Sequence, residues 1–508
     1  MACLLGIDSG LTITKAVVFD ESGILIAVAR RRLKQIMPQP RHVERDMANL
    51  WLQTAEAIRE ALGKCGRPAN DIAAVAATAH GDGLYLLDGA GAPLGRGALS
   101  LDSRAGQLAD DWEQDGTSAK VLALSGQAAH ASAPASILAW IKRNDPERFD
   151  RIGHVIACKD WLRACLTGTI GTDFTEASTS FTNVNTQVYD PAILEAFGLA
   201  ALKQAMPPVL RPDEIAGHVT AEAARLTGLV AGTPVVAGLH DVTASALGIG
   251  GLKEGTVAIV AGTYSINETL TSKPKTDPRW FCRNGLKPGE WNNMAISPAS
   301  AANYDWFLDT LCEGERAAIE ADGQSIHDRL VPEIEAAFSR PSTLLFQPYL
   351  FGSPYGPAAS AGFLGLHGWH NRGDMLRAVL EGIVFNHRVH VEALRDGFDT
   401  RCARLTGGIS RNPLFAQLFA DVLAMPVAVT DTEEAAAWGA ALCAGAGVGL
   451  FASPYDDPRE LSEASHTSKP DSGRSAQLDR RYRLHCKAAE VLSGLWPDIE
   501  SLAPERRA

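Results

Sequence analysis

Short apolar runs near the start of the chain alternate with polar turns, a pattern typical of a β-meander. Residues 4–7 and 15–19 are two such runs, joined by the polar segment 8–14, and a third run covers 24–28. Residues 48–62 then carry apolar positions at helical spacing. Because strand and helix patterns keep alternating through most of the sequence, we predict an α/β fold.

The opening pattern recurs in the second half of the chain. Residues 256–260 form an apolar run that breaks at Gly262-Thr263, much as the first run breaks at its own Gly and Thr. The recurrence indicates either a duplicated fold or a coincidence, and the pattern alone leaves both open.

The length of 508 residues exceeds one compact core, so two large domains are expected. Paired glycines at 248–251 favour a hinged boundary there. We therefore predict domains over residues 1–248 and 249–452. Residues 453–508 are predicted to be an exposed segment and a terminal helix, packed on the second domain.

Composition narrows the function classes. The net charge of -12 argues against a general nucleic-acid-binding protein, although it is compatible with an anionic nucleotide. The nine cysteines are scattered without a CxxC motif, and no basic segment precedes the first acid, so we expect reduced thiols, no signal peptide and a cytoplasmic protein. Residues 435–452 lack charge, but they are mostly Ala and Gly, which predicts a close-packed buried helix rather than a membrane span.

The turn after the first apolar run carries the first candidate chemistry. Its polar residues are Asp8, Gly10, Thr12, Thr14 and Lys15. Backbone amides, hydroxyls and a lysine suit a polyphosphate, and an acid at a strand end can hold Mg²⁺. A plain hairpin with polar turn residues explains the string equally simply.

Two turns in the second half have a similar character. Gly262 and Thr263 follow one apolar run, and Gly407 and Gly408 follow another. Asn412 is a candidate N-cap for the next helix, whose positive end would favour an anion. Glycine pairs are common in turns, so each of these signals is weak alone.

His240 and Asp241 lie between an apolar run and an Ala-rich helix pattern. By default such an acid is a helix N-cap. The functional alternative is a general base that takes a proton from an attacking hydroxyl.

Polar residues that follow other strand patterns could bind a polyhydroxy ligand. They are His80, Asp82, Asp102 and Arg104. Asp, His and Arg at strand ends supply fixed donors and acceptors, but a turn acid and a surface ion pair are an equal alternative. The chain has no P-loop lysine motif and no nucleophile elbow, and the pairs His387/His390 and His367/His370 have no obvious further ligand to complete a metal site.

Taken in order, these segments resemble the FGGY family of carbohydrate kinases over nearly the whole chain up to about residue 450. The most specific piece is 405–427, followed by 434–441, with matching turns at 8–12, 239–241 and 261–263.

The resemblance implies two actin-like, ribonuclease H-like domains with a cleft between them. It implies that the first domain binds sugar and the second binds nucleotide. Asp241 would be the catalytic base and Asp8 would help to hold Mg²⁺, while Thr12, Lys15 and Thr263 would surround the phosphates of ATP. Gly408 and Asn412 would lie at the adenosine end, and His80, Asp82, Asp102 and Arg104 would lie in the sugar pocket.

The resemblance also bears on the substrate. His80-Gly-Asp82 stands where D-xylulose kinases have Gln-Met-His, and Gly352-Ser353 stands where the family often has a Gly-Glu-Arg-type segment. Both departures look closer to kinases for L-xylulose, 3-keto-L-gulonate or erythritol.

We therefore expect an ATP-dependent phosphotransferase acting on an alcohol group of a ketopentose, keto-sugar acid or polyol. The alternative is an actin- or chaperone-like ATP-driven switch without a sugar substrate. Neither nucleic acid nor membrane is an expected partner. The sequence leaves open whether the protein forms a homodimer.

Overall fold

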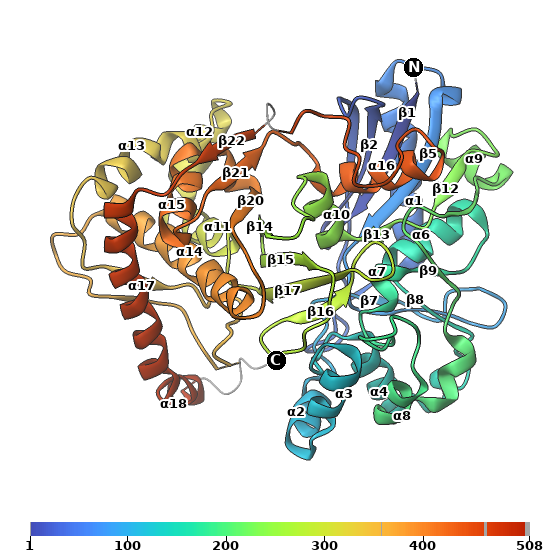
Figure 1. Ribbon diagram of the computed structural model, residues 1–508, viewed down its shortest axis with the longest axis horizontal. Coiled ribbons are helices and arrows are strands. Elements are labelled where there is room, and N and C mark those ends of the chain that lie inside the picture. Colours follow the sequence, from blue (N-terminus) through green and yellow to red (C-terminus); the bar gives the residue numbers. More distant parts are fainter. Residues whose placement is uncertain (1, 357, 462–464, 503–508) are drawn as a thin grey trace. The chain divides into compact units, whose positions relative to one another are not determined.

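The computed structural model describes residues 2–356, 358–461 and 465–502 (Figure 1). The chain forms two compact units. Unit 1 contains residues 1–254, 270–294 and 432–464, and unit 2 contains residues 255–269, 295–431 and 465–508. Each unit therefore includes segments that are far apart in the sequence.

Unit 1 is organised around a seven-stranded mixed sheet with the order β11-β12-β5-β1-β2-β3, in which β13 also pairs with β5. Its strands are β1 (Cys3–Ser9), β2 (Ile13–Asp20), β3 (Leu25–Arg32), β5 (Ile72–Ala79), β11 (Ile215–His218), β12 (Pro234–Val236) and β13 (Leu239–His240). The first three strands are the predicted antiparallel meander, with Asp8 opposite Lys15.

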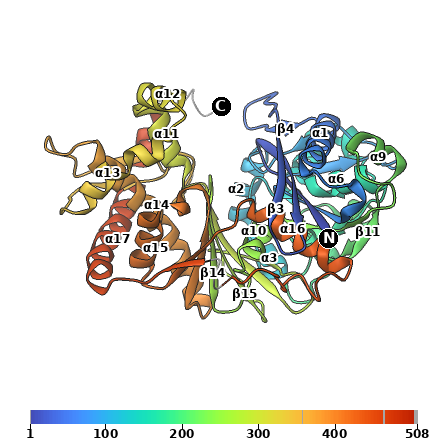
Figure 2. The ribbon, with the colours of Figure 1, turned by 90° about the horizontal axis from the view of Figure 1, so that it is seen from above.

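The two faces of this sheet are covered by different helices. Leu5 and Ile7 pack in one hydrophobic core with Leu50 and Ile58 of α1 (Met47–Cys65), the predicted helix. Because side chains alternate along a strand, the intervening Gly6 faces the opposite side. Helices α10 (Asp241–Gly248) and α16 (Ala435–Gly447) lie there (Figure 2).

Helix α16 confirms the prediction of a buried Ala- and Gly-rich helix. A side chain at Gly6 would meet the Ala437 carbonyl oxygen at 2.1 Å, and one at Gly439 would meet that of Ala244 in α10 at 1.9 Å. The small residues therefore let α16 approach both the sheet and α10. No helix among the described residues is long and apolar enough to cross a membrane.

Unit 1 contains further short strands and helices. They are β4 (Glu44–Arg45), β6 (Tyr85–Leu87), β7 (Gly97–Ala98), α2 (Gly106–Asp115), α3 (Thr117–Ser125), α4 (Pro134–Asn144), α5 (Pro146–Phe149), β8 (His154–Ile156), α6 (Cys158–Thr167), β9 (Thr172–Asp173), α7 (Phe174–Ala177), α8 (Pro191–Ala196), β10 (Val209–Leu210) and α9 (Ala221–Thr227).

The second seven-stranded sheet has the order β16-β17-β15-β14-β20-β21-β22. Its strands are β14 (Thr256–Ala261), β15 (Ser265–Thr271), β16 (Phe281–Asn284), β17 (Trp291–Ser297), β20 (Cys402–Thr406), β21 (Val427–Thr430) and β22 (Ser465–Ser468). Strand β14 pairs antiparallel with β15 and parallel with β20, as β1 pairs with β2 and β5. The faint recurrence in the sequence is thus a real correspondence of topology.

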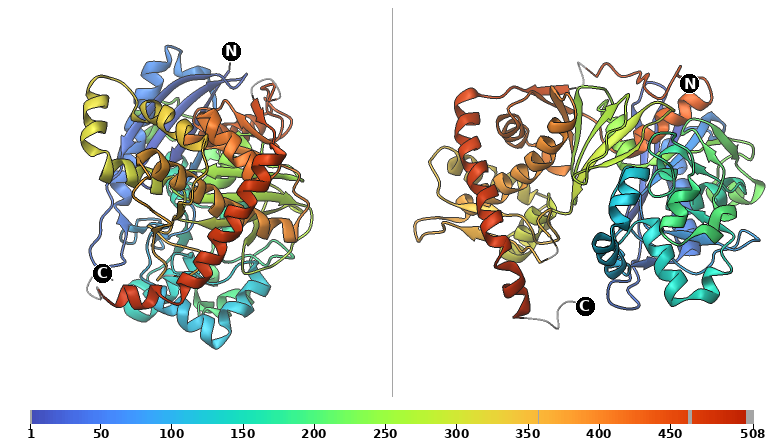
Figure 3. Two further views of the ribbon diagram at one scale, coloured as in Figure 1. Left: turned by 90° about the vertical axis from the view of Figure 1, so that its left-hand side faces the viewer. Right: turned by 60° about the horizontal axis from the view of Figure 1, so that its bottom comes forward.

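The helices of unit 2 are α11 (Ala302–Leu311), α12 (Glu313–Ala321), α13 (Ile326–Phe338), α14 (Arg372–Gly397), α15 (Pro413–Leu423), α17 (Ser472–Ser493) and α18 (Trp496–Ser501), and a small sheet is formed by β18 (Leu345–Gln347) and β19 (Gly362–Leu364). Strand β16 of the second sheet belongs to unit 1. The long α17 packs along α14 and α15 (Figure 3). The terminal helix expected within residues 453–508 corresponds to α17.

The tail after residue 453 also contributes a strand that the sequence did not indicate. Strand β22 pairs with β21 at the edge of the second sheet. An edge strand with the sequence Ser-His-Thr-Ser needs no apolar alternation, so no period-2 signal marks it.

Candidate active site

Three parallel-paired strands of unit 1 end at the same edge of its sheet. Strand β1 ends just after Asp8, β5 leads into His80, and β13 ends at His240, directly before Asp241. Because the carboxyl ends of neighbouring parallel strands lie together, residues far apart in the sequence meet at this edge.

Asp241 is the first residue of α10, and His240 takes the N-cap position. Oδ1 of Asp241 accepts a hydrogen bond of 2.8 Å from the Val242 amide. Burial, reinforced by the negative charge of Asp8, raises the pKa of Asp241 to about 7. Since 28% of the side chain is still accessible, this carboxylate can both meet a ligand and exchange a proton near neutral pH.

Asp8 and Lys15 face each other across the β1–β2 hairpin. The Lys15 ammonium lies 3.4 Å from Asp8 and 2.7 Å from Glu434, which immediately precedes α16. Burial raises the pKa of Asp8, whereas the pKa of Glu434 is lowered because Lys15 outweighs the effect of burial. Arg30 also pairs with Glu434. The ammonium is therefore fixed between two carboxylates.

The turn between β1 and β2 is stabilised by hydrogen bonds from a buried arginine. The Arg45 guanidinium donates to the carbonyls of Gly10 and Leu11, leaving the Thr12 side chain exposed. Thr14 is different, because its hydroxyl is buried and hydrogen-bonded to Thr54 of α1. The structure thus places Thr12 at the surface of the turn and Thr14 in the packing beneath it.

The turn after β5 has an unusual backbone. Asp82 has a φ of 54°, a left-handed conformation that is rare for a residue with a side chain. A side chain at Gly81 would meet the His240 ring at 1.6 Å, so only glycine fits there. Burial lowers the pKa of His80 and of His240 to about 3, and both rings are neutral at physiological pH.

Arg283 of β16, which the sequence did not point to, organises this turn. It donates to Asp82 at 2.8 Å and to Gln127 at 3.1 Å, and it lies 3.3 Å from Nε2 of His240. Its charge keeps the pKa of Asp82 below the ordinary value in spite of burial. Only 1% of the Arg283 side chain is exposed, so the guanidinium is fully engaged within the protein.

Asp102 and Arg104 form a buried ion pair with each other, at 2.7 Å, and Arg104 also pairs with Glu44. The Asp102 side chain is fully buried and accepts the Val43 amide as well. The polar groups of Asp102 and Arg104 therefore bind other groups of the protein. This agrees with the alternative prediction of an ion pair, except that the pair is buried and not at the surface.

The predicted nucleotide residues of unit 2 gather at the carboxyl ends of β14 and β20. Gly407, at a φ of 122°, approaches the Ala261 carbonyl so closely that a side chain would lie 2.2 Å from it. Gly408 and Thr263 are exposed at the same strand ends. Asn412 caps α15 by accepting the Leu414 amide at 2.9 Å, as predicted.

Comparison with known proteins decides the family. Residues 3–248 match the N-terminal domain of the FGGY family of carbohydrate kinases, and residues 257–448 match its C-terminal domain. The chain belongs to the FGGY family. It is a carbohydrate kinase, and kinases of this family use ATP.

Two curated relatives match this FGGY kinase over almost its whole length. An L-xylulose/3-keto-L-gulonate kinase of Escherichia coli (strain K12) is 34% identical over 501 residues, which cover 98% of each chain. An erythritol kinase of Brucella abortus (strain 2308) is 29% identical over 521 residues, again 98% of each chain. The structure of a ligand-bound xylulose kinase from Lactobacillus acidophilus superposes with a TM-score of 0.87 at 22% identity, covering 98% of this chain and 100% of that one. This last likeness confirms the predicted two-domain, actin-like α/β fold.

The paired histidines of the kinase have structural partners. His387 lies 3.0 Å from the Ser300 hydroxyl and 2.9 Å from Asn267, and His390 lies 2.9 Å from the Ser297 hydroxyl. Among the residues that the structure describes, no group of three or more His, Cys, Asp or Glu side chains is arranged to hold a metal ion.

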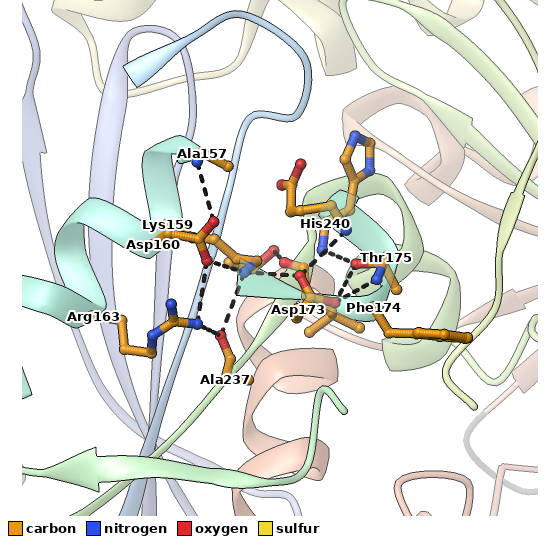
Figure 4. Close-up of polar contacts among 12 residues, drawn as sticks. Ala157, Lys159, Asp160, Arg163, Asp173, Phe174, Thr175, Ala237 and His240 are labelled. Atoms are coloured by element: carbon orange, nitrogen blue, oxygen red, sulfur yellow. Dashed lines mark hydrogen bonds and ion pairs between the residues drawn. The ribbon is translucent and has the colours of Figure 1, made fainter. Parts of the chain in front are cut away.

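Sequence reasoning missed a buried ion cluster that is linked through Thr175 to His240, formed by Lys159, Asp160, Arg163 and Asp173 (Figure 4). All four side chains are fully buried. Charged residues inside the otherwise apolar helix α6 were the available signal, since such residues are rarely buried without partners.

Proposed function

We propose that this FGGY kinase transfers the γ-phosphate of Mg-ATP to a terminal primary hydroxyl of a small neutral sugar or polyol, with Asp241 as the general base. The observation that carries the proposal is the position of Asp241, a partly accessible carboxylate at the start of α10 where β1, β5 and β13 end, and burial raises its pKa to about 7. A base poised near neutral pH can accept the hydroxyl proton as the oxygen attacks phosphorus.

Asp8 suits the role of a magnesium-holding residue. Mg²⁺ prefers carboxylate oxygens, keeps several waters and needs only one or two protein ligands, so the absence of a larger acidic group does not count against it. Asp8 is buried, has a raised pKa and is close enough to Asp241 to raise its pKa too, so a divalent cation would relieve both effects. When bound, Mg²⁺ neutralises phosphate charge in such transfers.

The turn residues supply donors for the phosphates and the nucleoside. In unit 1, the Gly10 turn, Thr12 and Lys15 are the proposed phosphate contacts, and we propose that Thr14 supports this turn from beneath. In unit 2, Gly262 and Thr263 are proposed to contact phosphate, and Gly407, Gly408 and Asn412 to line the nucleotide site. Backbone amides at glycine turns and at the start of a helix favour anions.

Charge balance favours a neutral acceptor over a sugar acid. Arg283, the cation nearest to His240, is already paired with Asp82 and is almost fully buried. The histidines at positions 80 and 240 are neutral, and the charges that act most strongly on Asp241 are the carboxylates of Asp8 and Asp82, which would repel a substrate carboxylate. His80, Asp82 and His240 instead offer polar groups suited to hydroxyls.

Replacement of the base tests the proposed role of Asp241. We expect Asp241→Asn to lower kcat by ~10²–10⁴-fold, because a general base contributes about that much. Calorimetry should still detect ATP binding, since the amide keeps the shape of the side chain. Near-normal turnover would remove Asp241 from the mechanism, and ATP hydrolysis that no sugar stimulates would favour an ATP-driven switch.

Substrate preference tests the charge argument. We expect kcat/KM for L-xylulose or erythritol to exceed that for 3-keto-L-gulonate by about tenfold or more, in line with the ~1.4 kcal/mol that a tenfold preference requires. Asp82→Asn, which leaves Arg283 without its carboxylate partner, should shift the ratio toward the acid. An unchanged ratio, or a wild-type preference for the acid, would contradict the neutral-substrate proposal while leaving the role of Asp241 intact.

A further inference from the structure

The segment that places Asp241 is a short and irregular one. Strand β12 ends at Val236, Gly238 adopts a φ of 75°, and β13 contains only two residues before α10 begins. A side chain at Gly238 would meet the Ala77 carbonyl at 1.9 Å. So short a strand has few ladder hydrogen bonds, and its position must be fixed by other groups.

Buried side chains hold the backbone of this segment. Arg163 and Lys159 donate to the Ala237 carbonyl at 3.1 and 3.4 Å. The Thr78 hydroxyl donates to the Leu239 carbonyl at 2.7 Å. The carbonyls on both sides of Gly238 are therefore anchored by side chains.

The amide nearest to the base is held by Thr175. The His240 N–H donates to the Thr175 hydroxyl at 2.9 Å, one residue before Asp241 (Figure 4). The same hydroxyl donates to Oδ2 of Asp173 at 2.7 Å, and that oxygen also accepts the Thr175 amide. Because its proton is committed to Asp173, the hydroxyl must present a lone pair to the His240 amide.

Asp173 is in turn fixed by the buried ion cluster. Its Oδ1 lies 2.8 Å from the Lys159 ammonium, which lies 2.6 Å from Asp160. Burial opposes the charge on Lys159, but the two carboxylates outweigh it and raise the pKa of Lys159. The four side chains of the cluster carry two positive and two negative charges.

We propose that Thr175, oriented by Asp173 and the buried ion cluster, is a positioning residue that sets the place of the Asp241 carboxylate through the His240 backbone. The inference rests on the proposed role of Asp241 as the base. Displacing a catalytic group by about 1 Å can cost ~10²-fold in rate, so a single lost hydrogen bond at this amide would be felt in the chemical step.

Thr175→Val tests the inference, because valine has the shape of threonine without the hydroxyl. We expect kcat to fall by roughly 10- to 100-fold. The KM values for sugar and ATP should stay within about threefold, and the pH at half-maximal kcat should not move, since the substitution removes no charged group. Thr175→Ser, which restores the hydroxyl, should recover most of kcat.

Thr227→Val is the matched control. The Thr227 hydroxyl is equally buried, donates to Ala223 at 2.7 Å and accepts the Leu229 amide at 3.2 Å, but it lies at the end of α9. Its loss should lower the melting temperature about as much as Thr175→Val while leaving kcat unchanged. If Thr175→Val does not fold, Thr175→Cys gives the same comparison, because a thiol is a weak acceptor.

The outcomes separate the two proposals. If Asp241→Asn abolishes turnover but Thr175→Val has the same kcat as the Thr227→Val control, the proposed positioning role of Thr175 is wrong, whereas the proposed role of Asp241 as the base still holds. A rise in KM at constant kcat would likewise overturn it, because it would show a substrate contact. If Asp241→Asn turns over normally, the proposed base itself fails.

Discussion

The β1–β2 hairpin of unit 1 and the β14–β15 hairpin of unit 2 hold the same place in their sheets, but their chemistry differs. Each first strand pairs antiparallel with the second and parallel with a later strand, β5 or β20. One pair before the turn, the first hairpin sets Asp8 opposite Lys15, whereas the second sets Val260 opposite Ile266. The two hairpins therefore share a backbone topology, but the same position holds an ion pair in the first and an apolar pair in the second.

The difference extends to how each turn is supported. The first turn is braced by Arg45, and its lysine is clamped by Glu434. The second turn is supported by close backbone packing, with Gly407 against Ala261 and the Ala301 amide donating to the Gly262 carbonyl at 2.9 Å. Duplicated topology thus provides two glycine turns, and substitution at a few positions gives one of them the charges proposed to hold the metal and phosphates.

Of the substitutions in the two hairpins, removal of the Asp8 charge from the first hairpin should cause the largest loss of activity. We expect Asp8→Asn to lower kcat by ~10²–10³-fold, because an ionised group aimed at developing charge contributes about that much. Steady-state kinetics at saturating Mg-ATP measures the loss.

Asp20→Asn is the control for the same hairpin. Asp20 lies at its far end, opposite Cys3, and accepts hydrogen bonds from Ser22 and Ile24. We expect kcat to be unchanged in this variant. Equal losses at positions 8 and 20 would mean that the charge in the first hairpin is structural and not catalytic.

A side chain at Gly407, where the backbone packs closely against Ala261 of the second hairpin, should have the next largest effect, in this case on ATP binding. Gly407→Ala would force a methyl group to within 2.2 Å of the Ala261 carbonyl at a backbone angle that alanine disfavours. We expect the Kd for ATP to rise about tenfold or more, measured by calorimetry, because the loop must move by roughly an ångström.

Gly314 of α12, outside the proposed nucleotide site, provides the comparison for that variant. A side chain there has no neighbouring atom within 4 Å, so Gly314→Ala should leave the ATP affinity within about twofold. If both alanine variants bind ATP like the wild type, the glycine turn of unit 2 is not part of the nucleotide site.

The pH dependence should show the smallest effect. Asp241 must be ionised to act as a base, so kcat/KM for the sugar should fall about tenfold per pH unit below a midpoint at or below its metal-free pKa of about 7. Because the negative charge of Asp8 helps to raise that pKa, the ionisation of Asp241 in the Mg²⁺-free protein, followed by titration, should have a lower midpoint in Asp8→Asn. A midpoint that does not move would show that Asp8 and Asp241 are not electrostatically coupled.

Much of the architecture was predictable because it follows from local patterns. Apolar runs gave the β1–β3 meander and β14, helical spacing gave α1, and uncharged small residues gave the buried helix α16. The Asn412 cap was found because the side chain bonds to an amide only two residues away. The edge strand β22 was missed because its residues carry no periodic signal.

The sequence by itself determined the α/β class, the family and the candidate base, because strand periodicity, glycine turns and motif order are properties of contiguous residues. Only the tertiary structure decided which charges face one another. Lys15 meets Glu434 across 419 positions and Asp82 meets Arg283 across 201, while the buried ion cluster reaches His240 through Thr175. Such pairings depend on how strands order within a sheet and how helices cross it, and no local window of sequence records that arrangement.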